Sequence, residues 1–187
     1  MSKKYCGYVS IIGKPNVGKS SIINAILKKK VSITSRKSQT TRNNILGIKT
    51  TDNKQAIFID TPGLHIKSQK TMNKILNKSA QSIIEDSDIV LFVVQRLSLT
   101  EEDHAILSKL KETNPFSICV INKIDQISDK QRLLPFIEKI SDEYNFASII
   151  PISAKTNQNL QDLINKIEEH LPENDHIYDD AFNLTNN

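Results

Sequence analysis

Residues 11–27 read IIGKPNVGKSSIINAIL and decide the fold, because they join an apolar run to a glycine-containing loop and then to a helical pattern. From Gly13 to Ser20 the loop follows the pattern G-x-x-x-x-G-K-S, which is the spacing of a P-loop. In a P-loop, consecutive backbone N–H groups and the positive end of the following helix face one concavity. The stretch therefore predicts a site for a di- or triphosphate.

Each residue type in this loop has a separate role at a phosphate. Gly13 and Gly18 allow close approaches that a Cβ would block. The Lys19 ammonium is expected over the β- and γ-phosphates and the Ser20 hydroxyl on magnesium. Lys14 is expected on a more exposed side of the loop. The nucleotide-binding residues predicted here are Gly13, Lys14, Pro15, Asn16, Val17, Gly18, Lys19, Ser20 and Ser21.

Alternating apolar and helical patterns predict an α/β fold. Strands are predicted at 8–12, 44–49, 55–60, 88–94, 116–122 and 148–153, and helices at 21–29, 72–85, 101–113, 130–145 and 160–171. The segment between the second and third strands is too short for a crossover, so these two strands should form an antiparallel hairpin. We therefore predict a three-layer P-loop fold with a six-stranded, mostly parallel sheet, one antiparallel edge strand and helices on both faces.

The third predicted strand, with the sequence IFID, ends in Asp60 and is followed by TPG. A carboxylate at this strand end can hold the magnesium shell, usually through water, and the Gly63 N–H can meet a γ-phosphate. This segment is therefore a predicted γ-phosphate sensor. Its predicted nucleotide-binding residues are Asp60, Thr61, Pro62, Gly63 and Leu64.

Two further strand ends carry residues that can select the base. Asp125 follows the fifth strand, and its carboxylate can accept hydrogen bonds from the ring N–H and the exocyclic amine of guanine. Adenine would leave that carboxylate unpaired, at about 1 to 3 kcal/mol or more. After the sixth strand, residues 153–155 can meet the base through a backbone N–H and a lysine stem. The predicted base-contacting residues are Asn122, Lys123, Ile124, Asp125, Ser153, Ala154 and Lys155.

A second hydroxyl ligand for magnesium is expected in the loop between the first helix and the second strand. Thr41 is the candidate and Thr40 is the alternative, because only their spacing separates them. Together with Ser20 and Asp60, Thr41 completes the predicted metal ligands.

Five segments together resemble the Era family of bacterial GTPases. They are GKPNVGKSSIINAIL, KSQTTRNNILGI, DTPGLH, NKID and ISAKTNQNLQDL. The resemblance extends over residues 5–172 and implies a P-loop GTPase fold that binds GTP and GDP with Mg²⁺ and hydrolyses GTP slowly. It also implies a molecular switch in small (30S) ribosomal subunit biogenesis, with the small subunit and its rRNA as partners.

Leu64 departs from the pattern of Ras-like enzymes, in which a glutamine at this place orients the attacking water. Resemblance to the wider TrmE-Era clan implies that Asn16 helps to hold a potassium ion instead, and the alternative is that Asn16 only braces the loop. The residues assigned to catalysis are Asn16, Lys19, Thr41 and Gly63. His65 is a weak candidate for a base, because nothing in the sequence fixes its orientation.

Members of this family carry an RNA-binding KH domain after the GTPase domain, and that domain needs a G-x-x-G loop. All five glycines lie at or before Gly63. We therefore expect residues 1–172 to be the GTPase domain, residues 173–187 to be an acidic linker or disordered tail, and the KH domain to be missing. RNA binding by this chain is accordingly expected to be weak.

The charge distribution and the apolar segments of the chain bear on its partners and its location. All 25 Lys and Arg but only 15 of the 21 acidic residues lie in 1–167, and this basic excess fits either an RNA or anionic membrane surface or ordinary solvated lysines. Without a signal peptide or an apolar run long enough to span a bilayer, we expect a monomeric cytoplasmic protein, with peripheral contact to the inner membrane left open. Two alternative functions remain: a nucleotide-binding module with negligible turnover, and a related GTPase for transfer RNA modification.

Overall fold

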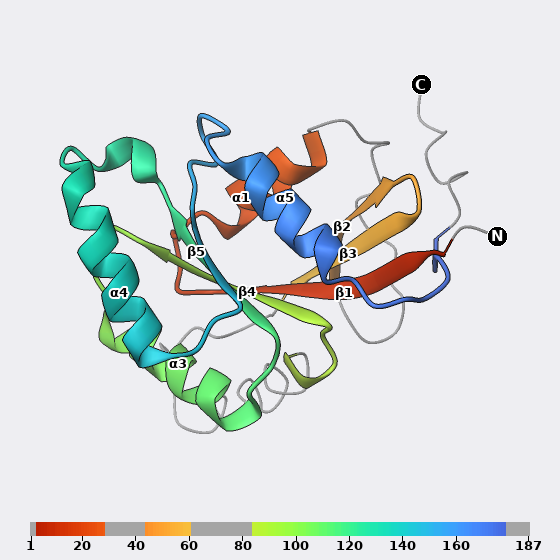
Figure 1. The fold of residues 1–187 in the computed structure, drawn as a ribbon, viewed down its shortest axis with the longest axis horizontal. Helices are drawn as coiled ribbons and strands as arrows, with labels where there is room; N and C mark the ends of the chain where they lie inside the picture. The colour runs from red at the N-terminus through yellow and green to blue at the C-terminus, as the bar shows by residue number, and fades with distance from the viewer. Residues whose placement is uncertain (1–2, 29–43, 61–83, 179–187) are drawn as a thin grey trace.

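The computed structural model describes residues 3–28, 44–60 and 84–178. In this part of the chain, six strands form one sheet in the order β2-β3-β1-β4-β5-β6 (Figure 1). The strands are β1 (Tyr5–Ile12), β2 (Asn44–Thr51), β3 (Lys54–Asp60), β4 (Ile89–Gln95), β5 (Ser117–Asn122) and β6 (Ser148–Pro151). Only the β2–β3 pair is antiparallel among these strands, which confirms the predicted sheet.

The β2–β3 hairpin turns tightly, since Thr51 pairs with Lys54. Asp52 in the turn has a φ of 46°, a left-handed value that Asp tolerates better than most residues. The hairpin returns the chain to β1, where Asp60 at the end of β3 pairs with Ile11. The end of β3 therefore lies beside the end of β1, from which the P-loop leaves the sheet.

Helices cover both faces of the sheet. In Figure 1, α1 (Lys19–Lys28) and α5 (Leu160–Glu169) lie on one face, and α3 (Glu101–Thr113) and α4 (Leu133–Glu143) lie on the other. Two short 3-10 turns are η1 (Ile124–Gln126) and η2 (Lys130–Arg132). The helix predicted at 72–85 falls outside the described residues except for its last two positions. None of the described helices has the length and apolar character needed to cross a bilayer.

Two apolar layers hold the helices to the sheet. One stripe of α5, made of Leu160, Leu163, Ile164 and Ile167, is buried, as its i, i+3, i+4, i+7 spacing predicts. On the sheet, β5 is buried at every position because helices cover both of its faces. Each fully buried Leu, Ile or Val side chain among them stabilises the fold by about 1.5 to 3 kcal/mol. The sheet is therefore a rigid frame for the loops at its carboxyl edge.

The helix predicted at 130–145 is divided into η2 and α4. The Asp129 carboxylate accepts a hydrogen bond from Gln131 N at 3.0 Å, and this side-chain bond favours a tight turn at η2. Pro135 is the third residue of α4, where its missing N–H would have no partner within the helix. The α-helix therefore begins at Leu133 rather than at residue 130.

Packing continues beyond residue 172, the last residue of the predicted GTPase domain. Two backbone hydrogen bonds join the following segment to the start of β1: Cys6 N donates to Pro172 O at 3.0 Å, and Asn174 N donates to Lys4 O at 3.2 Å. We call residues 172–178 the C-terminal strap, which runs beside the beginning of β1 (Figure 1). Residues 179–187, the remainder of the predicted tail, lie outside the described residues.

Candidate nucleotide-binding site

The P-loop leaves β1 and enters α1, and two of its positions can hold only glycine. Gly13 has a φ of +149°, and a Cβ added there would lie 2.5 Å from the Val93 carbonyl oxygen of β4. Gly18 has a φ of +98°, and a Cβ there would collide with the side-chain nitrogen of Asn122. Because backbone and side-chain neighbours occupy both places, the loop lies tightly against β4 and the end of β5.

The Lys19 ammonium lies over the loop that precedes it. Its Nζ donates to the carbonyl oxygens of Gly13 at 2.7 Å and Lys14 at 2.9 Å. This places a cation beside the amino end of α1, where the helix dipole also favours an anion. Val17 is fully buried and anchors the loop. The exposed positions of the loop and of the first turn of α1 are Pro15, Asn16, Ser20 and Ser21.

The expectation for Lys14 is wrong, because its side chain is only 14% exposed. Its Nζ lies 2.7 Å from Asp103 Oδ2 and 3.1 Å from Thr100 Oγ1. Thr100 precedes α3, and Asp103 is in the first turn of that helix. The side chain of Lys14 is therefore directed into an ion pair with α3 rather than toward solvent.

Asn122, at the end of β5, joins the P-loop to the segment after β6. Its side chain is almost fully buried and donates from Nδ2 to Val17 O at 2.8 Å. The oxygen of the same side chain accepts the Ala154 N–H at 3.1 Å. Next to it, Lys123 has a φ of 65°, and its Nζ donates to Asn16 O at 2.6 Å. Three loops predicted from separate motifs are thus connected by two side chains.

The Asp125 carboxylate lies in η1 and is exposed at the same edge of the sheet. Ser153 Oγ, which is buried, donates to Asp125 Oδ1 at 2.6 Å and accepts the Thr156 N–H at 3.1 Å. The serine therefore fixes the direction of the carboxylate. The sequence places Ser153 only near the base, and its hydrogen bond to Asp125 is visible only in the structure.

The other residues of the two base segments divide between core and surface. Ile124 is 5% exposed and packs into the apolar layer under α3 and α4, which holds η1 in place. Ala154 is half-buried against the opposite layer, and Lys155 is exposed. The exposed lysine stem is free of the core, as contact with a base would require.

The predicted metal ligands fall partly within the described residues. Ser20 is exposed in the first turn of α1, and the backbone of Asp60 pairs with that of Ile11, two residues before the P-loop. The described residues contain no group of three or more His, Cys, Asp or Glu that could hold a metal ion. Magnesium in phosphate sites needs no such group, since it takes few protein ligands and keeps waters and phosphate oxygens. The residue types Ser20 and Asp60 fit that chemistry, since a hydroxyl and a carboxylate are both oxygen ligands.

Seven residues with predicted roles at magnesium, at the γ-phosphate or in catalysis lie outside the described residues. They are Thr40, Thr41, Thr61, Pro62, Gly63, Leu64 and His65. Their assigned roles therefore stay predictions.

Fold and loop geometry together define a protein of the P-loop α/β class. Residues 8–123 match the model of a family described as 50S ribosome-binding GTPase. The chain therefore belongs to this GTPase family.

Within the family, the chain is similar to GTPase Era. It is 49% identical to GTPase Era of Pseudomonas syringae pv. tomato over 173 residues, which cover 92% of this chain and 58% of the relative. A solved structure of a variant of Aquifex aeolicus Era bound to GDP·AlF4⁻ has 37% identity and a TM-score of 0.77, and covers 94% of this chain and 60% of that one. The same identity, TM-score and coverage hold for Era in complex with MgGDPNP and nucleotides 1506–1542 of 16S ribosomal RNA.

The chain spans about three fifths of the length of the curated relatives that it matches. The family model extends over the P-loop and the end of β5, and the architecture shared with Era confirms the P-loop GTPase fold.

Proposed function

We propose that this chain binds GTP and GDP with magnesium and hydrolyses GTP to GDP and phosphate. The observation that carries the proposal is the buried Asn122 side chain, which holds the P-loop at Val17 and the base segment at Ala154. One side chain therefore fixes the distance between a phosphate site and a base site. A nucleotide is the ligand class that needs both sites at once.

Guanine selection rests on Asp125. Its carboxylate is exposed toward the edge of the sheet and is oriented by the Ser153 hydroxyl at 2.6 Å. A carboxylate held in this way accepts two hydrogen bonds from guanine, whereas adenine presents no matching pair of donors. The Lys155 stem is proposed to cover one face of the ring.

Phosphate binding rests on the P-loop amides, the amino end of α1 and Lys19. In the described part of the chain, Lys19 Nζ donates to two carbonyl oxygens of the loop, and this position beside the amino end of α1 supports its proposed contact with the β- and γ-phosphates. Ser20, Asp60 and Thr41 are proposed to hold magnesium, which when bound neutralises phosphate charge. The family relation supports these roles.

Catalysis is proposed to depend on stabilising charge rather than on a strong base. Lys19 and the Gly63 N–H would meet the γ-phosphate, with Thr41 closing over it. Asn16 has a φ of 64° and is exposed on the loop, so its side chain is available to a monovalent cation. Stimulation by potassium follows from that assignment.

For the whole protein we infer a role in small ribosomal subunit assembly. The support is the Era structure with a segment of 16S ribosomal RNA and the similarity to relatives named GTPase Era. The family description names the 50S subunit instead, so binding to isolated 30S and 50S subunits would distinguish the two partners. A cytoplasmic monomer, with peripheral contact to the inner membrane, is part of the same proposal.

Single-turnover phosphate release tests the enzymatic proposal. The protein is mixed with GTP or ATP, with magnesium or EDTA, and in potassium or sodium salts. We expect release from GTP only, dependence on magnesium, and a faster rate in potassium. Equal rates with ATP would contradict guanine selection. Tight GTP binding without release in any salt would favour a binding module instead of a GTPase.

A further inference from the structure

A buried ion pair links the second residue of the P-loop to the beginning of α3. Lys14 Nζ lies 2.7 Å from Asp103 Oδ2, and the two side chains are 14% and 0% exposed. The same ammonium donates to Thr100 Oγ1 at 3.1 Å. Since the pair is buried, water screens it far less than it screens an ordinary surface pair.

The carboxylate of Asp103 is itself held in place by the start of its helix. Its Oδ2 accepts the Thr100 N–H and the Thr100 hydroxyl, both at 2.8 Å. Its Oδ1 has no hydrogen-bond partner in the described part of the chain. Burying a carboxylate with one unpaired oxygen costs free energy unless a cation lies beside it. In the described residues, the Lys14 ammonium is the cation that offsets this cost for Asp103.

Lys14 is also fixed through its backbone. Its carbonyl oxygen accepts from Lys19 Nζ at 2.9 Å, beside the Gly13 carbonyl at 2.7 Å. Gly13 in turn lies against β4 too closely to admit a Cβ. Asp103 therefore holds the side chain of the residue whose carbonyl oxygen holds the phosphate-facing lysine.

We propose that Asp103 and Thr100 are positioning residues of the phosphate site, acting through Lys14. They fix the position of Lys14 and keep its ammonium away from the phosphates. The positions of the two carbonyl oxygens that accept from Lys19 are fixed as a result. This inference rests on the proposed function. Both residues act through Lys14 and not through a contact of their own with the nucleotide, so their loss should chiefly speed nucleotide dissociation.

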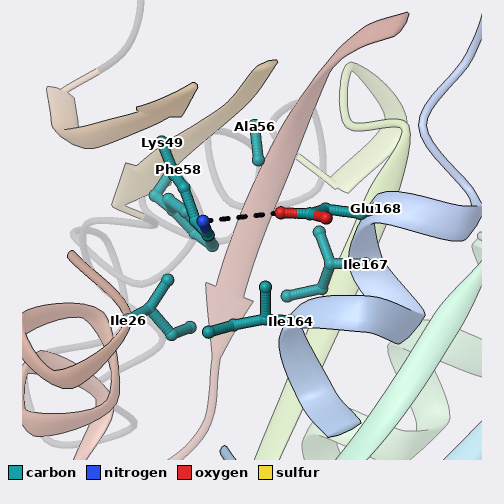
Figure 2. A pocket seen from close by; sticks show the side chains of 7 residues that line it. All are labelled: Ile26, Lys49, Ala56, Phe58, Ile164, Ile167 and Glu168. Atoms are coloured by element: carbon teal, nitrogen blue, oxygen red, sulfur yellow. Dashed lines mark ion pairs between the residues drawn. The ribbon is translucent and has the colours of Figure 1, made fainter. Parts of the chain in front are cut away.

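A second buried Lys–carboxylate pair offers a matched control. Lys49 of β2 and Glu168 of α5 lie 3.5 Å apart, with side chains 6% and 17% exposed. Figure 2 shows this pair among apolar side chains that include Phe58, Ile164 and Ile167. The pair joins β2 to α5 and makes no contact with the P-loop in the described residues. Removing its charge tests the effect of a lost buried ion pair alone.

The experiment measures dissociation of a fluorescent GDP analogue by stopped flow, with the melting temperature of each variant measured in parallel. We expect Asp103→Asn and Lys14→Met each to raise the dissociation rate about tenfold, and the double variant to exceed neither single variant, because contacting residues act as one unit. Lys14→Arg should restore a rate close to that of the parent. Glu168→Gln should lower the melting temperature while the dissociation rate stays within about twofold of the parent.

Several results would overturn the proposal. A normal dissociation rate in Asp103→Asn, with only a lower melting temperature, would make the pair merely structural. Additive effects of the two single variants would mean that Asp103 does not act through Lys14. If Asp103→Asn fails to fold, Thr100→Val decides the question, with a rise of about threefold expected and no rise contradicting the proposal. Failure of the unaltered protein to bind the GDP analogue would instead refute the proposed function.

Discussion

Two buried side-chain amides, those of Asn122 and Gln55, hydrogen-bond non-helical, non-strand segments at opposite ends of the sheet. The segments that they bind differ in backbone conformation. Asn122, 2% exposed, joins the P-loop to the segment after β6 at the carboxyl ends of the strands. Gln55, fully buried near the start of β3, accepts the N–H groups of Ile177 and Tyr178, both at 3.0 Å. It also donates to Tyr178 O at 2.8 Å and to Thr50 Oγ1 at 3.0 Å.

The chain that each amide holds differs in its backbone. Beside Asn122 the backbone has positive φ at Asn16, Gly18 and Lys123. Such conformations cost about 1 to 3 kcal/mol at a residue other than glycine, and they persist where function needs them. The described part of the C-terminal strap beside Gln55 has no positive φ. One amide therefore holds loops with left-handed backbone at the proposed nucleotide site, while the other closes the chain onto its own sheet.

The largest effect on nucleotide affinity should come from removing the Asn122 side chain. In Asn122→Ala, the Val17 carbonyl and the Ala154 N–H lose their partner, and the two loops are free to separate. We expect GDP affinity to fall by about 3 kcal/mol, or more than 100-fold. Isothermal titration measures the change. Asn165→Ala removes a similar amide from the exposed face of α5, and an equal loss in that control would contradict the bridging role.

Removing the Gln55 side chain should lower the stability of the fold without changing GDP affinity. In Gln55→Ala, the C-terminal strap loses its buried partner, and the free energy of unfolding should fall by about 2 kcal/mol. Urea unfolding measures this, with Gln161→Ala on the exposed face of α5 as the control. GDP affinity should stay within about twofold of the parent, and a larger loss would show that the two ends of the sheet are coupled.

The two cysteines provide a readout of strap release in the same variant. Cys6 Sγ donates to Gln55 Oε1 at 3.5 Å, and burial raises the pKa of both Cys6 and Cys119. A raised pKa keeps each thiol protonated near neutral pH, so thiol reagents should label the folded protein slowly and faster as the pH rises. In Gln55→Ala, Cys6 should react faster while Cys119, inside β5, should not. Equal acceleration at both would indicate global unfolding.

The carboxyl edge of the sheet was largely predictable from the sequence because its signals are local. Glycine and lysine spacing marked the P-loop, and apolar runs located the strand ends that carry Asp60 and Asn122. The predicted strand at 148–153 ends earlier, because β6 stops at Pro151, two residues before Ser153. The helix over residues 101–113 was also predictable, because its apolar residues recur at helical spacing, and α3 has the same bounds.

What could not be predicted depends on residues far apart in the sequence. The direction of the Lys14 side chain is set by Asp103, 89 positions later. Gln55 looks like an ordinary polar residue at the start of a strand, and the acidic composition of the C-terminal strap is typical of a linker. Their hydrogen bonds span 122 and 123 positions. No pattern of neighbouring residues carries that information.

The carboxyl edge of the sheet is proposed to bind a guanine nucleotide through Asp125. In Asp125→Asn, the acceptor for the guanine N–H groups is lost, while the new amide can donate to the additional carbonyl of xanthine. Titration with GDP and xanthosine diphosphate measures the preference directly, with Asp142→Asn on the exposed face of α4 as the control. We predict that Asp125→Asn shifts the preference toward xanthine by about tenfold or more. A variant that still prefers GDP as strongly as the parent would contradict the assignment of the site.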